Sequence, residues 1–216
     1  MDNPLYSAIF RIASVLEIPV VVAALLALAL VVVELGRFAV EFAARTRRRP
    51  GPARAAALER VARVARTAAV GDDGAAAAAR TLATVSWSAA MTATYEQIVR
   101  HPGDENAVAK DLADFDLDAQ RRLGRTRLLV RLGPALGLMG TLIPLAPALD
   151  GLARGNTRAL TDNLQVAFSI TVLGLLIGAV AFGLSLVRET MYGQDFSDVE
   201  YVVAVYTGGV PVEAAA

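Results

Sequence analysis

The sequence contains no cysteine and a single histidine, His101, among its 216 residues. Without cysteine the chain has no disulfide bond, no thiolate metal site and no cysteine nucleophile. One histidine cannot build a histidine-based metal site or a conventional catalytic triad within one chain, and its neighbours Pro102 and Gly103 are typical of an exposed turn. The sequence also lacks a phosphate-binding glycine loop. We therefore expect no enzymatic activity, no metal and no cofactor.

Aromatic residues make up only 6% of the chain and charged residues 19%, whereas 55% of the residues are hydrophobic and the mean hydropathy is +0.48. That balance is too apolar for an ordinary soluble domain of this size. A bilayer core of ~30 Å is crossed by about 20 helical residues, and three apolar runs approach or reach that length. The sequence therefore predicts an all-α polytopic membrane protein with transmembrane helices at residues 18–36, 132–149 and 163–187.

Positive charge is placed unevenly along the chain. Of the 21 lysines and arginines, 17 lie between residues 37 and 131, so the positive-inside rule makes this loop cytoplasmic. Residues 1–17 and the turn at 150–162 are then outside, and residues 188–216 form a cytoplasmic helix and tail. A cleavable signal peptide is the competing interpretation of the first run. It is disfavoured because only Arg11 precedes the run and the basic cluster follows it.

The cytoplasmic loop is predicted to be a helical insertion between spans 1 and 2, and not an independent enzyme domain. Alanine and arginine at helical spacing predict one helix at Ala53–Val70 and a second at Ala75–Arg100. A third helix begins after its N-cap, Asp104, and continues without a clear break into the second span. Trp87 and Tyr95 are expected to pack these helices or to meet the lipid interface.

The arginines of this loop do not predict a nucleic-acid partner. Basic faces attract phosphate, but residues 37–131 also hold eleven acidic residues, so the loop is only moderately basic. Membrane topology and contact with anionic lipid headgroups explain the arginines. We expect the lipid bilayer, and no nucleic acid, as their partner.

Two threonines lie near the middle of the second and third apolar runs. Thr141 is ten residues beyond Arg131 and Thr171 is nine beyond Asp162, which places both about 14–15 Å deep if the runs form a helical hairpin. A hydroxyl at that depth bonds to a backbone carbonyl of its own helix, to a partner helix or to water in a pore. For either threonine alone a hydroxyl bonded within its own helix is favoured, whereas two threonines at equal depth on faces of small residues favour a shared polar track.

Small residues surround the two threonines. Such residues let helices approach closely in lipid, where packing drives association, and pairs four residues apart are typical of these contacts. Prolines in the second run are candidates for bending its helix. The small residues expected at the packing or pore surface are Gly133, Gly137, Gly140, Ala167, Gly174 and Gly178, and the candidate kinks are Pro134, Pro144 and Pro147.

Two segments resemble signatures of a known family. Residues 133–143 (GPALGLMGTLI) are similar to the second-span signature of the MotA/TolQ/ExbB proton-channel family, and residues 167–175 (AFSITVLGL) resemble its third-span signature. Three spans with a large loop after the first agree with the TolQ/ExbB branch. The resemblance implies a bacterial or archaeal cytoplasmic membrane and a homopentamer around single-span helices of an ExbD/TolR/MotB-like partner. A partner aspartate then carries the proton of a motor, and Thr141 and Thr171 line its path.

The chain departs from the family pattern at two points. Val166, beside Gln165, stands where ExbB-type members often have a glutamate, and neither the second nor the third run contains an acidic residue. Any carboxylate at the midplane must therefore come from a partner. Pro144 replaces a glycine that usually follows the second-span threonine. A non-conducting membrane scaffold with the same packing is the alternative interpretation.

Overall fold

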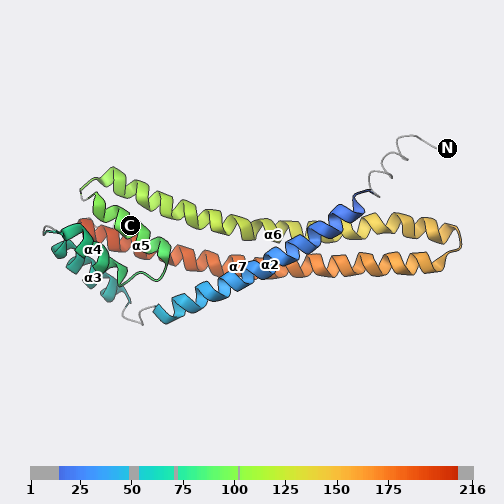
Figure 1. The fold of residues 1–216 in the computed structure, drawn as a ribbon, viewed down its shortest axis with the longest axis horizontal. Coiled ribbons are helices and arrows are strands. Elements are labelled where there is room, and N and C mark those ends of the chain that lie inside the picture. The colour runs from blue at the N-terminus through green and yellow to red at the C-terminus, as the bar shows by residue number, and fades with distance from the viewer. Residues whose placement is uncertain (1–14, 49–53, 71–72, 102, 209–216) are drawn as a thin grey trace, which may run out of the picture. The chain divides into compact units, whose positions relative to one another are not determined.

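The computed structural model describes residues 15–48, 54–70, 73–101 and 103–208, and within them every regular element is a helix. The all-α prediction is confirmed. Figure 1 shows the six helices, which are α2 (Glu17–Arg48), α3 (Arg54–Ala68), α4 (Gly74–Ala83), α5 (Ala89–Arg100), α6 (Glu105–Ala153) and α7 (Thr157–Thr207).

Three of the described helices, α2, α6 and α7, are long and apolar enough to cross a membrane, as the charge-poor runs predict. The chain divides into two compact units. Unit 1 comprises Met1–Arg37 and Gly124–Leu186, and unit 2 comprises Phe38–Leu123 and Val187–Ala216. Each of the three long helices contributes to both units.

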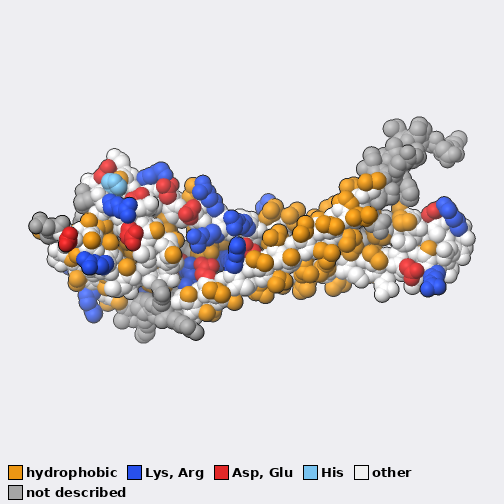
Figure 2. Space-filling model, in the orientation of Figure 1, with side chains coloured by type: hydrophobic (Ala, Val, Ile, Leu, Met, Phe, Trp, Pro, Cys, Tyr) orange, Lys and Arg blue, Asp and Glu red, His pale blue; other side chains and the backbone are white. Residues whose placement is uncertain are grey.

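Unit 1 contains the antiparallel α6–α7 hairpin and the first part of α2. The hairpin turns at Gly155, whose φ of 77° favours glycine, and the Asn156 side chain accepts a hydrogen bond from the Ala159 N–H at 3.1 Å. Large apolar side chains are exposed along the outside of these helices, and Figure 2 shows hydrophobic side chains covering much of the displayed face of unit 1. Its small interior contains Ala27, Val31, Leu129, Leu136, Ile177 and Ala181.

Unit 2 has the larger hydrophobic core, formed by α3, α4 and α5 with parts of α6 and α7. Trp87 and Tyr95 are buried in it, at 3% and 0% exposed, so the prediction that they pack these helices is confirmed. Asp104 caps α6, because its side chain accepts hydrogen bonds from the backbone N–H groups of Asn106 and Ala107 at 3.1 and 3.0 Å. α6 then runs on as one helix to Ala153, as expected.

The prediction of one helix over Ala75–Arg100 is wrong. Two helices occupy this segment, and α5 starts after Ser88, whose side chain accepts a hydrogen bond from the Met91 N–H at 3.2 Å. Hydroxyl side chains in the break hydrogen-bond to nearby carbonyls, Thr84 to Thr81 at 2.7 Å and Ser86 to Ser88 at 2.8 Å. These local bonds compete with the helical ladder, which a strong alanine pattern conceals.

Other predicted boundaries agree with the structure or lie outside the described residues. α3 matches the predicted helix 53–70 to within two residues, and His101 is exposed directly after α5. The third-span helix continues to Thr207. The sequence RRRPGP at Arg47–Pro52 predicts a break after the first span; α2 ends at Arg48, and residues 49–52, like the C-terminal tail after Gly208, fall outside what the structure describes.

Candidate functional site

The centre of unit 1 is a seam where α6 and α7 touch through glycine. A methyl group added at Gly133 would lie 2.6 Å from the Gly174 carbonyl oxygen and 2.7 Å from the Gly178 nitrogen. A methyl group at Gly174 would meet the Gly133 carbonyl oxygen at 2.5 Å. The two backbones are therefore in direct contact, which only glycine permits.

Thr171 lies on this seam, beside Gly137. Its hydroxyl donates to the Ala167 carbonyl, one turn back on α7, at 3.0 Å, and lies 3.3 Å from the Gly137 carbonyl of α6. A side chain at Gly137 would press on the Thr171 backbone, at 3.3 Å from its carbonyl oxygen. The glycine thus lets the threonine hydroxyl reach across to the neighbouring helix.

Thr141 lies four residues further along α6 than Gly137, and its hydroxyl donates to the Leu138 carbonyl at 2.8 Å. Because Thr171 is opposite Gly137, the two threonines are offset along the hairpin by about one turn, ~6 Å. Counting residues from the flanking charges predicts that the two threonines lie at the same depth. The structure offsets them by about one turn instead. Both side chains are half-buried within the single chain.

The remaining small residues also lie at α6–α7 contacts. A methyl group at Gly178 would meet the Pro134 ring at 2.9 Å, and one at Gly140 would overlap the Ile170 side chain. Ala167 is 3% exposed. All the small residues selected from the sequence are thus buried in unit 1.

The prolines change the hydrogen bonding around Thr141. α6 stays helical through Pro134, Pro144 and Pro147, and the structure buries Pro144 fully. Proline has no N–H, so the carbonyls four residues before Pro144 and Pro147, those of Gly140 and Ile143, lose their usual helical donor. Backbone acceptors therefore flank Thr141 on both sides.

Toward water or another chain, the Thr141 and Thr171 hydroxyls can act only as hydrogen-bond acceptors. A threonine hydroxyl has one hydrogen and two acceptor lone pairs, and the hydrogens of Thr141 and Thr171 are directed at backbone carbonyls. What remains for water or another chain is oxygen lone pairs. The apolar runs of α6 and α7 contain no acidic residue, so this site supplies no proton carrier of its own.

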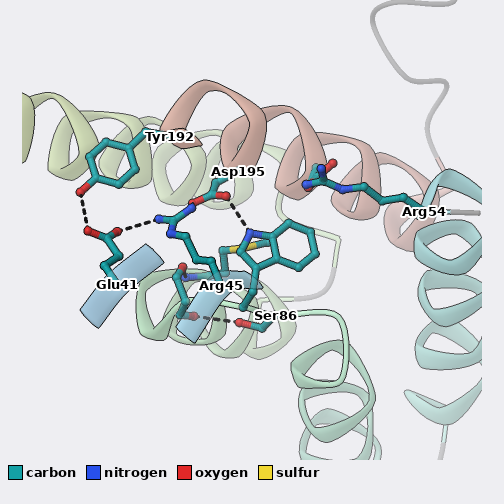
Figure 3. A network of polar contacts seen from close by, with 10 residues as sticks. Glu41, Arg45, Arg54, Ser86, Tyr192 and Asp195 are labelled. Atoms are coloured by element: carbon teal, nitrogen blue, oxygen red, sulfur yellow. Dashed lines mark hydrogen bonds and ion pairs between the residues drawn. The ribbon is translucent and has the colours of Figure 1, made fainter. Parts of the chain in front are cut away.

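A second polar cluster, in unit 2, centres on the buried carboxylate of Asp195, which is 2% exposed. Figure 3 shows that it receives Arg45 from α2 and the indole N–H of Trp87, which donates at 2.7 Å. Arg45 also donates to Glu41 at 2.8 Å, and Glu41 accepts from the Tyr192 hydroxyl at 3.3 Å. One α7 carboxylate therefore connects α2 with the link before α5.

The same cluster continues to α3. The Arg54 guanidinium lies 4.6 Å from the centre of the Trp87 ring and pairs with Asp198. Burial, followed by the charge of Asp195, raises the pKa of Tyr95 above its ordinary value. Burial and then Glu41 raise the pKa of Tyr192, against nearby arginines. Charges that are buried and paired in this way organise unit 2.

Sequence reasoning missed this cluster. Arg45 belongs to the basic cluster after the first apolar run, which the sequence explained by topology alone, although the residue is only 3% exposed. The available signal was Asp195 and Asp198, one helical turn apart in an extension that also carries buried apolar residues. Buried acids on an apolar helix face need partners.

Comparison with known proteins connects the seam to a family. The profile of the MotA/TolQ/ExbB proton channel family matches residues 76–189, more than half of the chain, and this range includes the complete glycine seam. Searches of curated proteins and of solved structures found no match. In the described part of the chain, no group of His, Asp or Glu could hold a metal ion. With three membrane-spanning candidates and this match, the chain is a multi-pass membrane protein that belongs to the MotA/TolQ/ExbB proton channel family.

Proposed function

We propose that the chain is the channel subunit of a motor driven by the proton-motive force, and that an aspartate on a single-span partner carries the proton. The observation that supports this most is the state of the seam hydroxyls. The hydroxyls of Thr141 and Thr171 donate their hydrogens to backbone carbonyls. Their oxygen lone pairs can still accept a hydrogen bond from a protonated carboxylic acid or from water.

The absence of acid from the seam fits this role. A fixed carboxylate near a partner aspartate would repel its charged form and hold its pKa up. A surface of threonine, glycine and alanine leaves the partner aspartate in contact with water without pairing its charge. The pKa of that aspartate can then change according to which side of the membrane the path is open to. The carrier can then gain a proton at one face and lose it at the other.

The assembly belongs to the same proposal. Five copies surround the partner helices in a bacterial or archaeal cytoplasmic membrane, with the N-terminus outside and the C-terminus inside. The distribution of arginine supports this orientation. Large apolar side chains are exposed along α6 and α7, which suits contact with lipid, with neighbouring copies and with a partner helix.

Proton flux in reconstituted vesicles tests the proposal. The native complex is purified, its single-span partner is identified, and an imposed proton gradient is followed with a pH-sensitive dye. Thr141→Val with Thr171→Val should abolish flux while the complex still assembles, and Thr141→Ser with Thr171→Ser should retain it because serine keeps the acceptor oxygen.

Two outcomes contradict the proposal. Full flux in the double valine variant would show that the hydroxyls are not part of the path. A native complex with no single-span partner and no flux would favour the non-conducting scaffold, in which the glycine seam serves packing alone.

A further inference from the structure

A groove in unit 2 lies outside the channel site. It runs between α4 and α5 with a volume of about 470 Å³. Its floor is made of small apolar residues, and charged side chains form its rim. The floor residues are Ala75, Ala76, Ala79, Ala83 and Val99, and the rim residues are Arg80, Glu96 and Arg100.

The groove has features of an unoccupied helix-binding surface. Alanine lets another helix approach closely, as small residues do elsewhere in helix packing. The Arg80 side chain donates to the Ala76 carbonyl of its own helix at 3.1 Å. Within the described residues, Glu96 and Arg100 have no ionic partner. The rim therefore offers two positive charges and one negative charge to an incoming surface.

The first third of α6 carries a surface of complementary character, the Leu117 stripe, which consists of Lys110, Asp114, Leu117, Asp118 and Arg121. Leu117 is an apolar side chain that is 44% exposed, with Asp114 and Asp118 on either side of it. With two acids and two bases the stripe is neutral overall, but its acids lie next to Leu117 and its bases lie at the two ends.

The acids of the Leu117 stripe are available to another chain. Within the stripe, Asp114 pairs with Lys110 and Asp118 with Arg121, but all four side chains are more than half exposed. Exposed pairs of this kind contribute little, and they exchange partners readily. A basic rim facing the stripe can therefore replace them.

We propose that the α4–α5 groove receives the Leu117 stripe of a second copy of this chain. Leu117 is exposed in its own chain, so it does not fill the groove of that chain. In Figure 1 the first third of α6 and the α3–α4 pair lie on opposite sides of unit 2. Two different faces that fit each other produce a head-to-tail contact, which forms a ring when the rotation between neighbouring copies closes. This inference rests on the homo-oligomer of the proposed function and assigns its contact surface outside the spans.

Paired cysteines test the contact directly, because the chain has no cysteine of its own. Ala79→Cys in the groove and Leu117→Cys in the stripe are combined in the full chain and oxidised in native membranes. The expected result is a ladder of dimers and higher oligomers on a denaturing gel. Each single variant should give none. Ala55→Cys with Leu117→Cys is the matched control, because Ala55 is exposed on α3 and does not line the groove.

Charge reversal tests the electrostatics of the same pair. In the cysteine background, Arg80→Glu with Arg100→Glu should lower the cross-linked fraction at least fivefold, and adding Asp114→Arg with Asp118→Arg should restore it. High salt should weaken the contact, because exposed charges are screened. Equal cross-linking by the control pair, cross-linking of Ala79→Cys to a different protein, or no rescue by the second reversal would overturn the inference.

The outcome is separable from that of the channel. Cross-linking needs no proton flux, so the double valine variant of Thr141 and Thr171 should give the same ladder. A ladder without threonine-dependent flux leaves the contact standing and removes the proposed function. Threonine-dependent flux without a ladder supports the proposed function and overturns the contact.

Discussion

Gly174 is the position where a single methyl group should do the most damage to the seam. In Gly174→Ala the new methyl carbon would lie 2.5 Å from the Gly133 carbonyl oxygen and 2.7 Å from the Gly137 Cα. Ordinary contact is about 3.5 Å or more, and the obstructing atoms are backbone, so α6 and α7 must separate by ~1 Å. Overpacking of this kind costs about 1–3 kcal/mol.

The same separation should weaken the contact between helices at Thr171. Its hydroxyl lies 3.3 Å from the Gly137 carbonyl, already longer than a usual O–H···O hydrogen bond, and a further ~1 Å removes this contact. The bond of Thr171 to Ala167 on its own helix remains. The variant therefore loses helix packing and one polar contact but keeps each helix intact.

Gly183→Ala is the matched control. Gly183 is on the same helix, and a methyl group added there meets nothing within 4 Å. Alanine is preferred over glycine in a helix by up to ~1 kcal/mol, so this variant should unfold like the natural protein or slightly later. The measurement is the free energy of unfolding in mixed micelles, followed by circular dichroism as denaturing detergent is added. Equal stability of Gly174→Ala and Gly183→Ala would refute the close backbone contact.

Two further predictions concern unit 2. Asp195→Asn leaves the buried Arg45 guanidinium with Glu41 as its remaining carboxylate and should destabilise the protein by about 1–3 kcal/mol, seen as a lower melting temperature and a changed emission of Trp87, the only tryptophan. Burial raises the pKa of Tyr95, so its neutral form stabilises the fold below the unfolded pKa of about 10, and this contribution is lost as pH rises above that value. Tyrosinate absorbance should show several late-ionising tyrosines, because burial also raises the pKa of Tyr192 and of Tyr206, and Tyr95→Phe should remove one of them. An unchanged titration would contradict the burial of Tyr95. The substitution itself should cost little stability, since the Tyr95 hydroxyl has no hydrogen-bond partner in the described residues.

The sequence was sufficient for features that depend on composition along one helix. Charge-free runs located the long apolar helices, and glycines four residues apart located the seam, because a helix repeat places Gly174 and Gly178 on one face. The contact of Gly133 with both of them follows from an antiparallel hairpin.

Features that depend on distant residues were not predictable in this way. Arg45 and Asp195 are 150 residues apart in sequence, and neither helix alone indicates the pairing. The break before α5 was missed for a different reason. Alanine is the strongest helix former and dominates the pattern there. However, α4 ends at Ala83, hydroxyl side chains in the break bond to nearby carbonyls, and the Ser88 side chain accepts from the Met91 N–H where α5 starts. A few local hydrogen bonds outweighed a compositional signal.

The hydrogen bonds of the two threonines decide how a flux measurement can be interpreted. Valine matches the shape of threonine, and each hydroxyl hydrogen of Thr141 and Thr171 goes to a carbonyl within its own helix that already belongs to the backbone ladder. Hydrogen bonds of side chains in membrane helices average only about 0.6 kcal/mol. The double valine variant should therefore fold and assemble, unlike Gly174→Ala. A loss of flux in it can be attributed to the missing acceptor oxygens and not to a disrupted seam.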